Sequence, residues 1–301
     1  MDNLRILSID GGGVRVVIAV HIMARLEQYI GAPLNQAFDM VAGTSAGAVA
    51  ACCIANGWSA RDMDAQWDDF ARRTFPRPRT FRDIARRVAN IGGVLPKYDG
   101  ESVNAVLRDL FGDAVMADLI VPHVMTVAFD PTTMSVQVIR SSDPKHRQTK
   151  VWEACRASSA GPMYLDAGPN GLLDGGVVGN NPTTLAIIHG IEVARERYAT
   201  DGNADDHLLV VSVGTGMPLR DRTAPRNIIG HVRRLLDIQL YADTPIWRLL
   251  KPKTYWRVQP VIPPYLATTD DARRLPELRL VAESFANNID PTLRSIADSL
   301  A

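Results

Sequence analysis

A short turn between an apolar strand and a helix of small residues places the strongest constraint on how this chain can fold. Phe38–Asn56 reads FDMVAGTSAGAVAACCIAN, so an apolar run meets GTSAG and then small residues without proline or charge. This order predicts a strand, a sharp turn and a buried helix. The small neighbours Gly43, Ala46 and Gly47 leave the Ser45 hydroxyl exposed at the helix N-terminus, as in a G-x-S-x-G nucleophile elbow. Ser45 is therefore a candidate nucleophile, and a serine that only caps the helix is the alternative.

A glycine-rich turn follows the first apolar strand. Leu4–Ile9 runs into DGGGVR, after which Val16–Tyr29 has apolar residues at helical spacing. Consecutive glycines let backbone amides approach an anion, either a phosphate or an oxyanion. A dinucleotide-binding fingerprint would need glycine where Val16 stands, which disfavours that fold. The candidate anion-binding residues are Gly11, Gly12, Gly13 and Arg15, and the alternative for Arg15 is a solvated residue at the helix start.

A second acidic residue with two following glycines lies after another apolar segment. Residues 171–182 read GLLDGGVVGNNP, which places Asp174 at the end of a short strand and Gly175 and Gly176 directly after it. An acid there lies at the carboxyl edge of a sheet, where open α/β sheets bind their ligands. The alternative is that Asp174 is only a turn residue. Pro182 suits the first turn of a helix that runs to about Tyr198.

Strand and helix patterns alternate along the 301 residues. This alternation predicts a three-layer α/β/α fold with a mainly parallel central sheet. The further strands are expected at Val124–Phe129, Met134–Ile139, Leu208–Val213 and Tyr255–Ile262. The further helices are expected at 59–70, 101–110, 151–160, 228–240 and 276–301, the last interrupted near Asp290.

Composition excludes several classes of protein. Lys and Arg together number 33, as do Asp and Glu, so no overall charge favours nucleic acid. The three cysteines lack metal spacing and predict buried, reduced thiols in a cytoplasmic protein. We expect no secretion signal, no membrane span, no calcium loop, no bound metal and no cofactor.

Two basic segments are candidates for peripheral contact with a membrane. Residues 71–97 hold eight Lys or Arg and one acid, interleaved with apolar side chains, and residues 230–257 mix arginines and lysines with Trp and Tyr. Such segments sit on anionic lipid surfaces, form mobile lids, or are solvated faces.

The histidines do not supply a clear general base. A triad in the order Ser, Asp, His would use His189, His207 or His231, and each falls within or at the start of an expected helix or strand. This favours a dyad in which Asp174 itself accepts the Ser45 proton. An ordinary Asp pKa of about 3.9 is too low for a good base, so the site must desolvate the carboxylate.

The order DGGGxR, GTSAG and then DGG with NNP resembles the patatin-like phospholipase family. ASSAGP at 157–162 and SVGTG at 212–216 are similar to further family landmarks, and the resemblance runs from Leu4 to about Gly216. Val16 stands where many members have glycine, and Gly161 where many have alanine. On this resemblance, residues 1–220 are a catalytic domain and 221–301 are an extension packed on it.

The resemblance implies a metal-independent lipid acyl hydrolase. Ser45 would form an acyl-enzyme, Asp174 would be its dyad partner, and Gly11, Gly12, Gly13 and Arg15 would form the oxyanion-hole segment. The substrate would be a phospholipid, a lysophospholipid or another acyl-ester lipid. The alternatives are a Ser-His-Asp esterase of another α/β family and a patatin-like module that binds anions or lipids without catalysis.

Overall fold

The expected three-layer architecture is present in the computed structural model, which describes residues 3–78, 80–91, 95–198, 204–219 and 255–301. A seven-stranded sheet has the order β4-β3-β2-β1-β6-β8, with β5 paired to β3. These strands are β1 Leu4–Ile9, β2 Met40–Thr44, β3 His123–Asp130, β4 Ser135–Arg140, β5 Leu173–Asp174, β6 Leu208–Val213 and β8 Tyr255–Val258.

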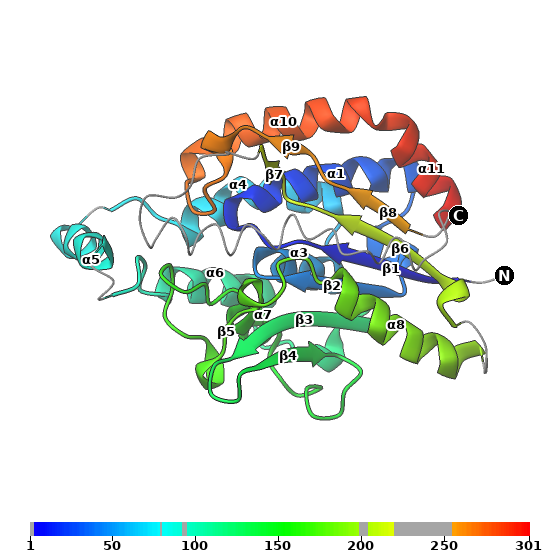
Figure 1. Ribbon diagram of the computed structural model, residues 1–301, viewed down its shortest axis with the longest axis horizontal. Coiled ribbons are helices and arrows are strands. Elements are labelled where there is room, and N and C mark those ends of the chain that lie inside the picture. Colours follow the sequence, from blue (N-terminus) through cyan, green and yellow to red (C-terminus); the bar gives the residue numbers. More distant parts are fainter. Residues whose placement is uncertain (1–2, 79, 92–94, 199–203, 220–254) are drawn as a thin grey trace.

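The sheet is mainly parallel. β1 pairs in parallel with β2 and β6, β2 with β3, and β6 with β8, while β4 and β5 run antiparallel to β3. The carboxyl ends of β1, β2 and β6 therefore lie at one edge, toward the left of Figure 1. That edge carries the glycine turn and the GTSAG turn.

Helices cover both faces of the sheet. Their bounds are α1 Val16–Ile30, α2 Leu34–Ala37, α3 Ala46–Ala55, α4 Ala60–Thr74, α5 Phe81–Ile91, α6 Glu101–Phe111, α7 Val151–Ser158, α8 Thr183–Tyr198, α10 Leu275–Asn288 and α11 Asp290–Leu300. Local signals fix some of these ends. The Ser59 hydroxyl accepts a hydrogen bond from the Asp62 amide at 3.0 Å and caps α4, and Gly31 ends α1 in the left-handed conformation.

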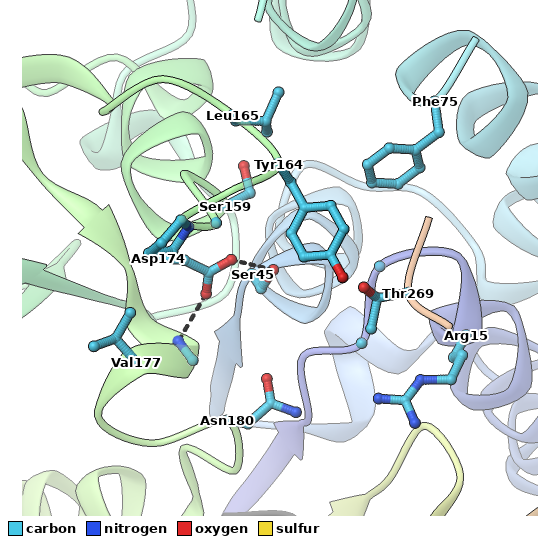
Figure 2. A pocket seen from close by; sticks show the side chains of 15 residues that line it. Arg15, Ser45, Phe75, Ser159, Tyr164, Leu165, Asp174, Val177, Asn180 and Thr269 are labelled. Atoms are coloured by element: carbon cyan, nitrogen blue, oxygen red, sulfur yellow. Dashed lines mark hydrogen bonds between the residues drawn. The ribbon is translucent and has the colours of Figure 1, made fainter. Parts of the chain in front are cut away.

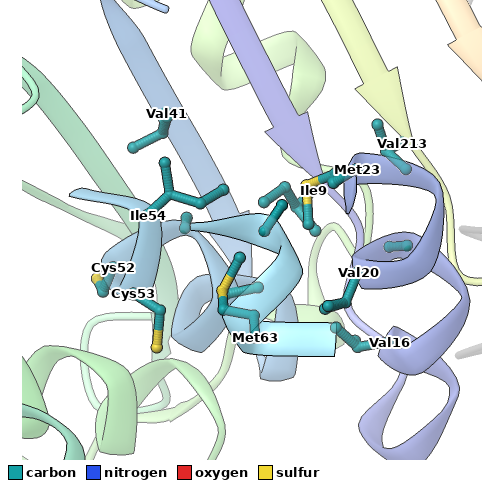
Figure 3. Close-up of a cluster of buried hydrophobic side chains, with 14 of the residues drawn as sticks. Ile9, Val16, Val20, Met23, Val41, Cys52, Cys53, Ile54, Met63 and Val213 are labelled. Atoms are coloured by element: carbon teal, nitrogen blue, oxygen red, sulfur yellow. The ribbon is translucent and has the colours of Figure 1, made fainter. Parts of the chain in front are cut away.

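The two faces of β1 belong to different cores because alternate side chains point to opposite sides. Leu7 and Ile9 join the large core formed with α1, α3, α4, α6, α7, α10 and α11 (Figures 1 and 3). Leu4 and Ile6 join a smaller core beneath α8. Cys52, Cys53 and Cys155 are all free and buried in the large core, where burial raises the thiol pKa of Cys53 and Cys155.

One expected strand is in fact two. The sequence predicted a single strand over Tyr255–Ile262, but β8 ends at Val258 and the separate β9, Val261–Ile262, pairs with β7, Met217–Pro218. Pro260 lies between them, and proline cannot donate a ladder hydrogen bond. The Pro260 carbonyl instead accepts a hydrogen bond from the Met217 amide at 2.8 Å.

Part of the expected organisation lies outside the described residues. The helix expected at 228–240, the boundary at residue 220 and most of the basic segment 230–257 fall there, and the division into residues 1–220 and 221–301 stays a prediction. Leu278, Ala282 and Ala286 of α10 are buried in the large core. Among the described helices, none combines the length and apolar character needed to cross a bilayer.

A buried ion pair links the glycine turn to the edge strand β8. Both terminal nitrogens of the Arg257 guanidinium donate to the Asp10 carboxylate, at 2.9 and 2.5 Å, and one also donates to the Ser212 hydroxyl at 2.8 Å. The Asp10 side chain is 0% exposed and that of Arg257 is 11% exposed. Arg257 was predicted to belong to a lipid-facing surface. That prediction is wrong for this residue, because its charge is used inside the protein.

We predict that Arg257→Ala lowers the free energy of unfolding by about 3–5 kcal/mol, because it leaves the Asp10 carboxylate buried without its cation. Urea denaturation followed by circular dichroism measures this change. Arg273→Ala is the matched control, since its side chain is 68% exposed and pairs with Asp271 at the surface. Equal stabilities for the two variants would contradict a structural role for the buried pair.

Candidate active site

Ser45 occupies the sharp turn that the GTSAG sequence predicts. It precedes α3 with φ 56° and ψ −130°, a conformation that is strained for a residue other than glycine. Its amide donates to the Ser158 hydroxyl at 2.9 Å, and that hydroxyl donates to the Val127 carbonyl at 2.5 Å. Ser158 thus holds the turn in place.

The two glycines of the elbow are needed for close backbone approach. A Cβ on Gly43 would lie 2.2 Å from the Gly47 carbonyl oxygen. A Cβ on Gly47 would lie 2.4 Å from the Asp10 carbonyl oxygen. Because neither glycine has a side chain, α3 can begin directly against the end of β1, and the Ser45 turn lies next to the glycine turn.

Asp174 is placed beside Ser45 by its own strand. β5 pairs with β3 so that Asp174 lies opposite Ala128, and the Asp174 amide donates to the Ala160 carbonyl at 3.0 Å. The Ser45 hydroxyl donates to Asp174 Oδ2 at 2.7 Å (Figure 2). The Gly176 amide donates to Asp174 Oδ1 at 2.7 Å. The structure therefore brings together two residues that are 129 positions apart in the sequence.

The glycines after Asp174 have separate functions. A Cβ on Gly175 would lie 2.3 Å from the Val127 carbonyl oxygen, so only glycine lets this turn pass so close to β3. Gly176 supplies the amide that orients the carboxylate. The remaining carboxylate oxygen is thereby directed to the serine.

The environment of Asp174 makes it a better base than an ordinary aspartate. Burial raises its pKa to about 6, although the hydrogen bonds from Gly176 and Ser45 act in the opposite direction. A carboxylate in this range is ionised at neutral pH, yet has a higher proton affinity than a solvated aspartate. This is the desolvation that the sequence argument required.

The glycine turn presents amides to the same site. Gly12, Gly13 and Ser45 all line one pocket. Gly13 has φ 57°, and a Cβ there would lie 1.9 Å from the Thr269 carbonyl oxygen. Within the described part of the chain, neither the Gly12 nor the Gly13 amide donates to another protein group. The Gly11 amide differs, because it already donates to the Asn180 carbonyl at 2.9 Å.

Arg15 is a buried residue, so the alternative of a solvated position at the helix start is wrong. Its side chain is 1% exposed, and its guanidinium donates to the Gly216 carbonyl at 3.2 Å. Its amide donates to the Gly12 carbonyl at 3.1 Å. Arg15 also lines the pocket, with its guanidinium on the side of Asn180 and Thr269 (Figure 2).

Several residues that line the pocket or support the glycine turn were not singled out from the sequence. The Asn180 side-chain amide and the Thr215 hydroxyl both donate to the Gly11 carbonyl, at 2.9 and 2.6 Å. The NNP and SVGTG segments contained these two residues, but the pattern gave them no individual function. Tyr164 and Phe75 also line the pocket (Figure 2), and the sequence assigned neither of them to the site.

The described histidines lie in other surroundings. None of them lines the pocket that contains Ser45. His189 contacts Arg140 and Glu192, and His207 stacks on Tyr198. His231 lies outside the described residues. Among the described residues, no cluster of three or more His, Cys, Asp or Glu side chains is arranged to hold a metal ion.

Comparisons with known proteins identify the family. The profile of the patatin-like phospholipases matches residues 7–187, which is more than half of the chain, so this protein belongs to that family. Human calcium-independent phospholipase A2-gamma is 26% identical over 335 aligned residues, which cover 99% of this chain and 40% of the human protein. The cGAMP-activated phospholipase of Vibrio cholerae is 28% identical, covering 62% of this chain and 57% of that protein.

Other similarities agree with the fold. The intracellular phospholipase A2 of Caenorhabditis elegans is 25% identical over 71% of this chain and 20% of its own length. This chain spans 20–57% of the length of these three curated relatives. The crystal structure of VipD from Legionella pneumophila matches with a TM-score of 0.51 at 11% identity, covering 98% of this chain and 67% of VipD, which supports the fold alone.

We predict that Asp174 makes stability depend on pH. With its native pKa raised to about 6, the buried carboxyl keeps its proton at pH values where an unfolded aspartate, with a pKa of about 3.9, has lost it. Its stabilising contribution is therefore complete below about pH 4 and is lost as the pH rises through about 6. The free energy of unfolding of the wild type, minus that of Asp174→Asn, should fall by about 3 kcal/mol over this range.

Urea denaturation of both proteins at several pH values between about 4 and 8 tests this linkage. The difference between the two proteins removes the contributions of titrating groups that they share. Parallel stability curves would mean that Asp174 titrates like a solvated carboxyl.

Proposed function

We propose that this protein hydrolyses carboxylic esters of acyl lipids through Ser45 and Asp174. The observation that carries the proposal is the 2.7 Å hydrogen bond from the Ser45 hydroxyl to the desolvated Asp174 carboxylate. The membership in the patatin-like phospholipase family and the phospholipase names of the relatives support the same reaction class.

The first chemical step moves one proton and forms one bond. The Ser45 oxygen attacks the carbonyl carbon of the ester while its proton passes to Asp174 Oδ2. When the tetrahedral intermediate collapses, the alcohol oxygen leaves with that proton and the acyl group remains on Ser45. Water then attacks the acyl-enzyme and gives one proton to Asp174. When the second tetrahedral intermediate collapses, the Ser45 oxygen leaves with that proton and the fatty acid is released.

The negative charge of the intermediate needs donors that are already in place. We assign the Gly12 and Gly13 amides to this oxyanion hole, because both residues line the pocket with Ser45. Gly11 supports the hole instead of donating to it, since its amide is bonded to Asn180. Arg15 is a buried positive charge at the same turn. The hydrogen bond from its backbone amide to the Gly12 carbonyl fixes the shape of the loop. One such donor contributes roughly 3 kcal/mol to a reaction of this type.

An apolar cavity that begins at Ser45 suits the acyl chain. Its lining is shared between the start of α3, the inner side of α4 and the inner side of α6, and it includes Val49, Trp67, Phe70, Ala71, Val106 and Leu110. Phe75 and Leu165 line both this cavity and the pocket over the dyad. From Thr74 back to Trp67 the cavity follows α4 over seven residue steps, or about 10 Å of helix.

We predict that Ser45→Ala and Asp174→Asn each lower kcat/KM for fatty acid release by about 10³-fold or more. The assay measures free fatty acid from phospholipid, lysophospholipid and short-chain ester substrates. Equal and severe losses in both folded variants are expected because the two residues act as one unit. An active Asp174→Asn protein would exclude the dyad.

Substitution of the histidines separates the dyad from a triad. His189→Gln, His207→Gln and His231→Gln, made one at a time, should keep most of the activity. A triad enzyme would lose activity at one of these positions while remaining folded, and such a result would overturn the proposed mechanism. A folded wild type that binds lipid vesicles without releasing fatty acid would favour the non-catalytic module.

We predict that Ala71→Phe shifts the preference toward shorter acyl chains. Ala71 is 5% exposed and lines the middle of the apolar cavity, so the added ring takes the space of several methylene groups. Each excluded methylene forfeits about 0.8 kcal/mol, and the ratio of kcat/KM for long and short chains should fall roughly 10- to 200-fold.

Ala65→Phe is the control for this change, since Ala65 lies on the exposed side of the same helix. It should leave the chain-length profile unaltered. The same shift in both variants would show that the cavity does not hold the acyl chain.

A further inference from the structure

Helix α5 carries an exposed apolar face with no protein partner among the described residues. Phe81, Ile84 and Val88 are 87%, 53% and 63% exposed, and their spacing places them on one side of the helix. Leu95, just beyond the helix, is 44% exposed. Scattered apolar side chains are common on protein surfaces, but a stripe along one helix indicates a binding surface.

The segment around this face is strongly basic. Residues 71–97 contain eight Lys or Arg and one acid, Asp83. Three of these cations, Arg72, Arg73 and Lys97, pair with carboxylates from outside the segment. Arg82 is exposed on α5 itself. Arg86 donates to the carbonyls of Pro96 and Tyr98, and Arg87 donates to the carbonyl of Pro76. Because these acceptors are neutral, the three hydrogen bonds fix the helix without cancelling its charge.

The same helix is fastened to the rim of the pocket. The Asn90 side chain donates to the Met163 carbonyl at 2.8 Å, and the Lys97 amide donates to the same carbonyl at 2.9 Å. The Tyr98 amide donates to the Tyr164 carbonyl at 2.8 Å. Tyr164 lines the pocket beside the dyad (Figure 2), and α5 lies at the left of Figure 1, toward which β1 and β6 run.

We propose that the face formed by Phe81, Ile84 and Val88 inserts into the interface of an anionic lipid bilayer and holds the pocket entrance against it. The apolar side chains would lie at the boundary between headgroups and acyl chains, while the surrounding arginines contact anionic headgroups. This inference rests on the proposed function, since a bilayer lipid is then the substrate. A protein partner would not require apolar and cationic groups together beside an acyl-chain cavity.

The experiment measures binding to vesicles without catalysis. Ser45→Ala protein is sedimented with vesicles of phosphatidylcholine and phosphatidylglycerol, and with vesicles of phosphatidylcholine alone. We expect tighter binding to the anionic vesicles. In that background, Phe81→Ser combined with Ile84→Ser and Val88→Ser should raise the apparent Kd about tenfold or more, because the apolar side chains no longer insert.

The matched control removes three exposed apolar side chains from other surfaces. Ile120, Ile188 and Leu280 are 62%, 52% and 66% exposed, and their combined substitution by serine should leave binding nearly unchanged. Equal loss in both triple variants, or no loss in the α5 variant, overturns the proposal. A change of oligomeric state in the α5 variant with unaltered vesicle binding also overturns it and indicates self-association.

The catalytically active protein separates this inference from the proposed function. With Ser45 intact, the α5 triple variant should keep the wild-type kcat/KM on a soluble short-chain ester and lose activity on anionic vesicles. If the folded α5 triple variant lost activity on both substrates, the α5 face would be needed for catalysis itself, and the docking role would be overturned. A wild type inactive on both would refute the hydrolase, while sedimentation would still decide the docking surface.

Discussion

The close backbone contact between the end of β1 and the start of α3 underlies the whole site. Gly47 allows it, since any side chain there would meet the carbonyl oxygens of Ile9 and Asp10 at 2.4–2.5 Å. The contact places the Ser45 turn beside the glycine turn without an intervening layer of side chains. The strained Ser45 backbone then rests on the sheet and on Ser158, so the surrounding fold supports the strain.

Two buried aspartates at this edge show how the same local sequence acquires different chemistry. Asp10 follows β1 and precedes three glycines, and Asp174 ends β5 and precedes two. Arg257 neutralises Asp10 with a bidentate ion pair, which makes Asp10 a structural anion. The Asp174 carboxylate is bonded to Ser45 and Gly176, neither of which carries a charge, and burial raises its pKa to about 6. One carboxylate is thus stabilised in its charged form, and the other is kept able to accept a proton.

The sequence predicted most of the fold and the main candidate residues because their signals are local. Strand, glycine and helix patterns lie within about twenty residues of one another, and their alternation indicates a mainly parallel sheet between layers of helices. The sequence did not distinguish Asp10 from Asp174 by partner, since Arg257 is 247 residues from Asp10. It also gave no individual function to Asn180 or Thr215, because their contacts with Gly11 depend on the assembled sheet edge.

The basic segments show where composition ceases to be informative. Arg257 and the arginines around α5 have the same charge and comparable aromatic neighbours in the sequence. Burial distinguishes the two groups of arginines. The Arg257 side chain is 11% exposed and is bonded to a carboxylate, whereas Arg82 on α5 is exposed beside the outward-facing Phe81 and Val88. The buried charge is paired within the fold and contributes to its specific structure. Exposed basic side chains beside exposed apolar ones can instead bind an anionic membrane surface. The hydrogen bonds from Asn90 and Lys97 to Met163 give α5 a direct connection to the pocket rim, so binding on its outer face positions the site that lies behind it.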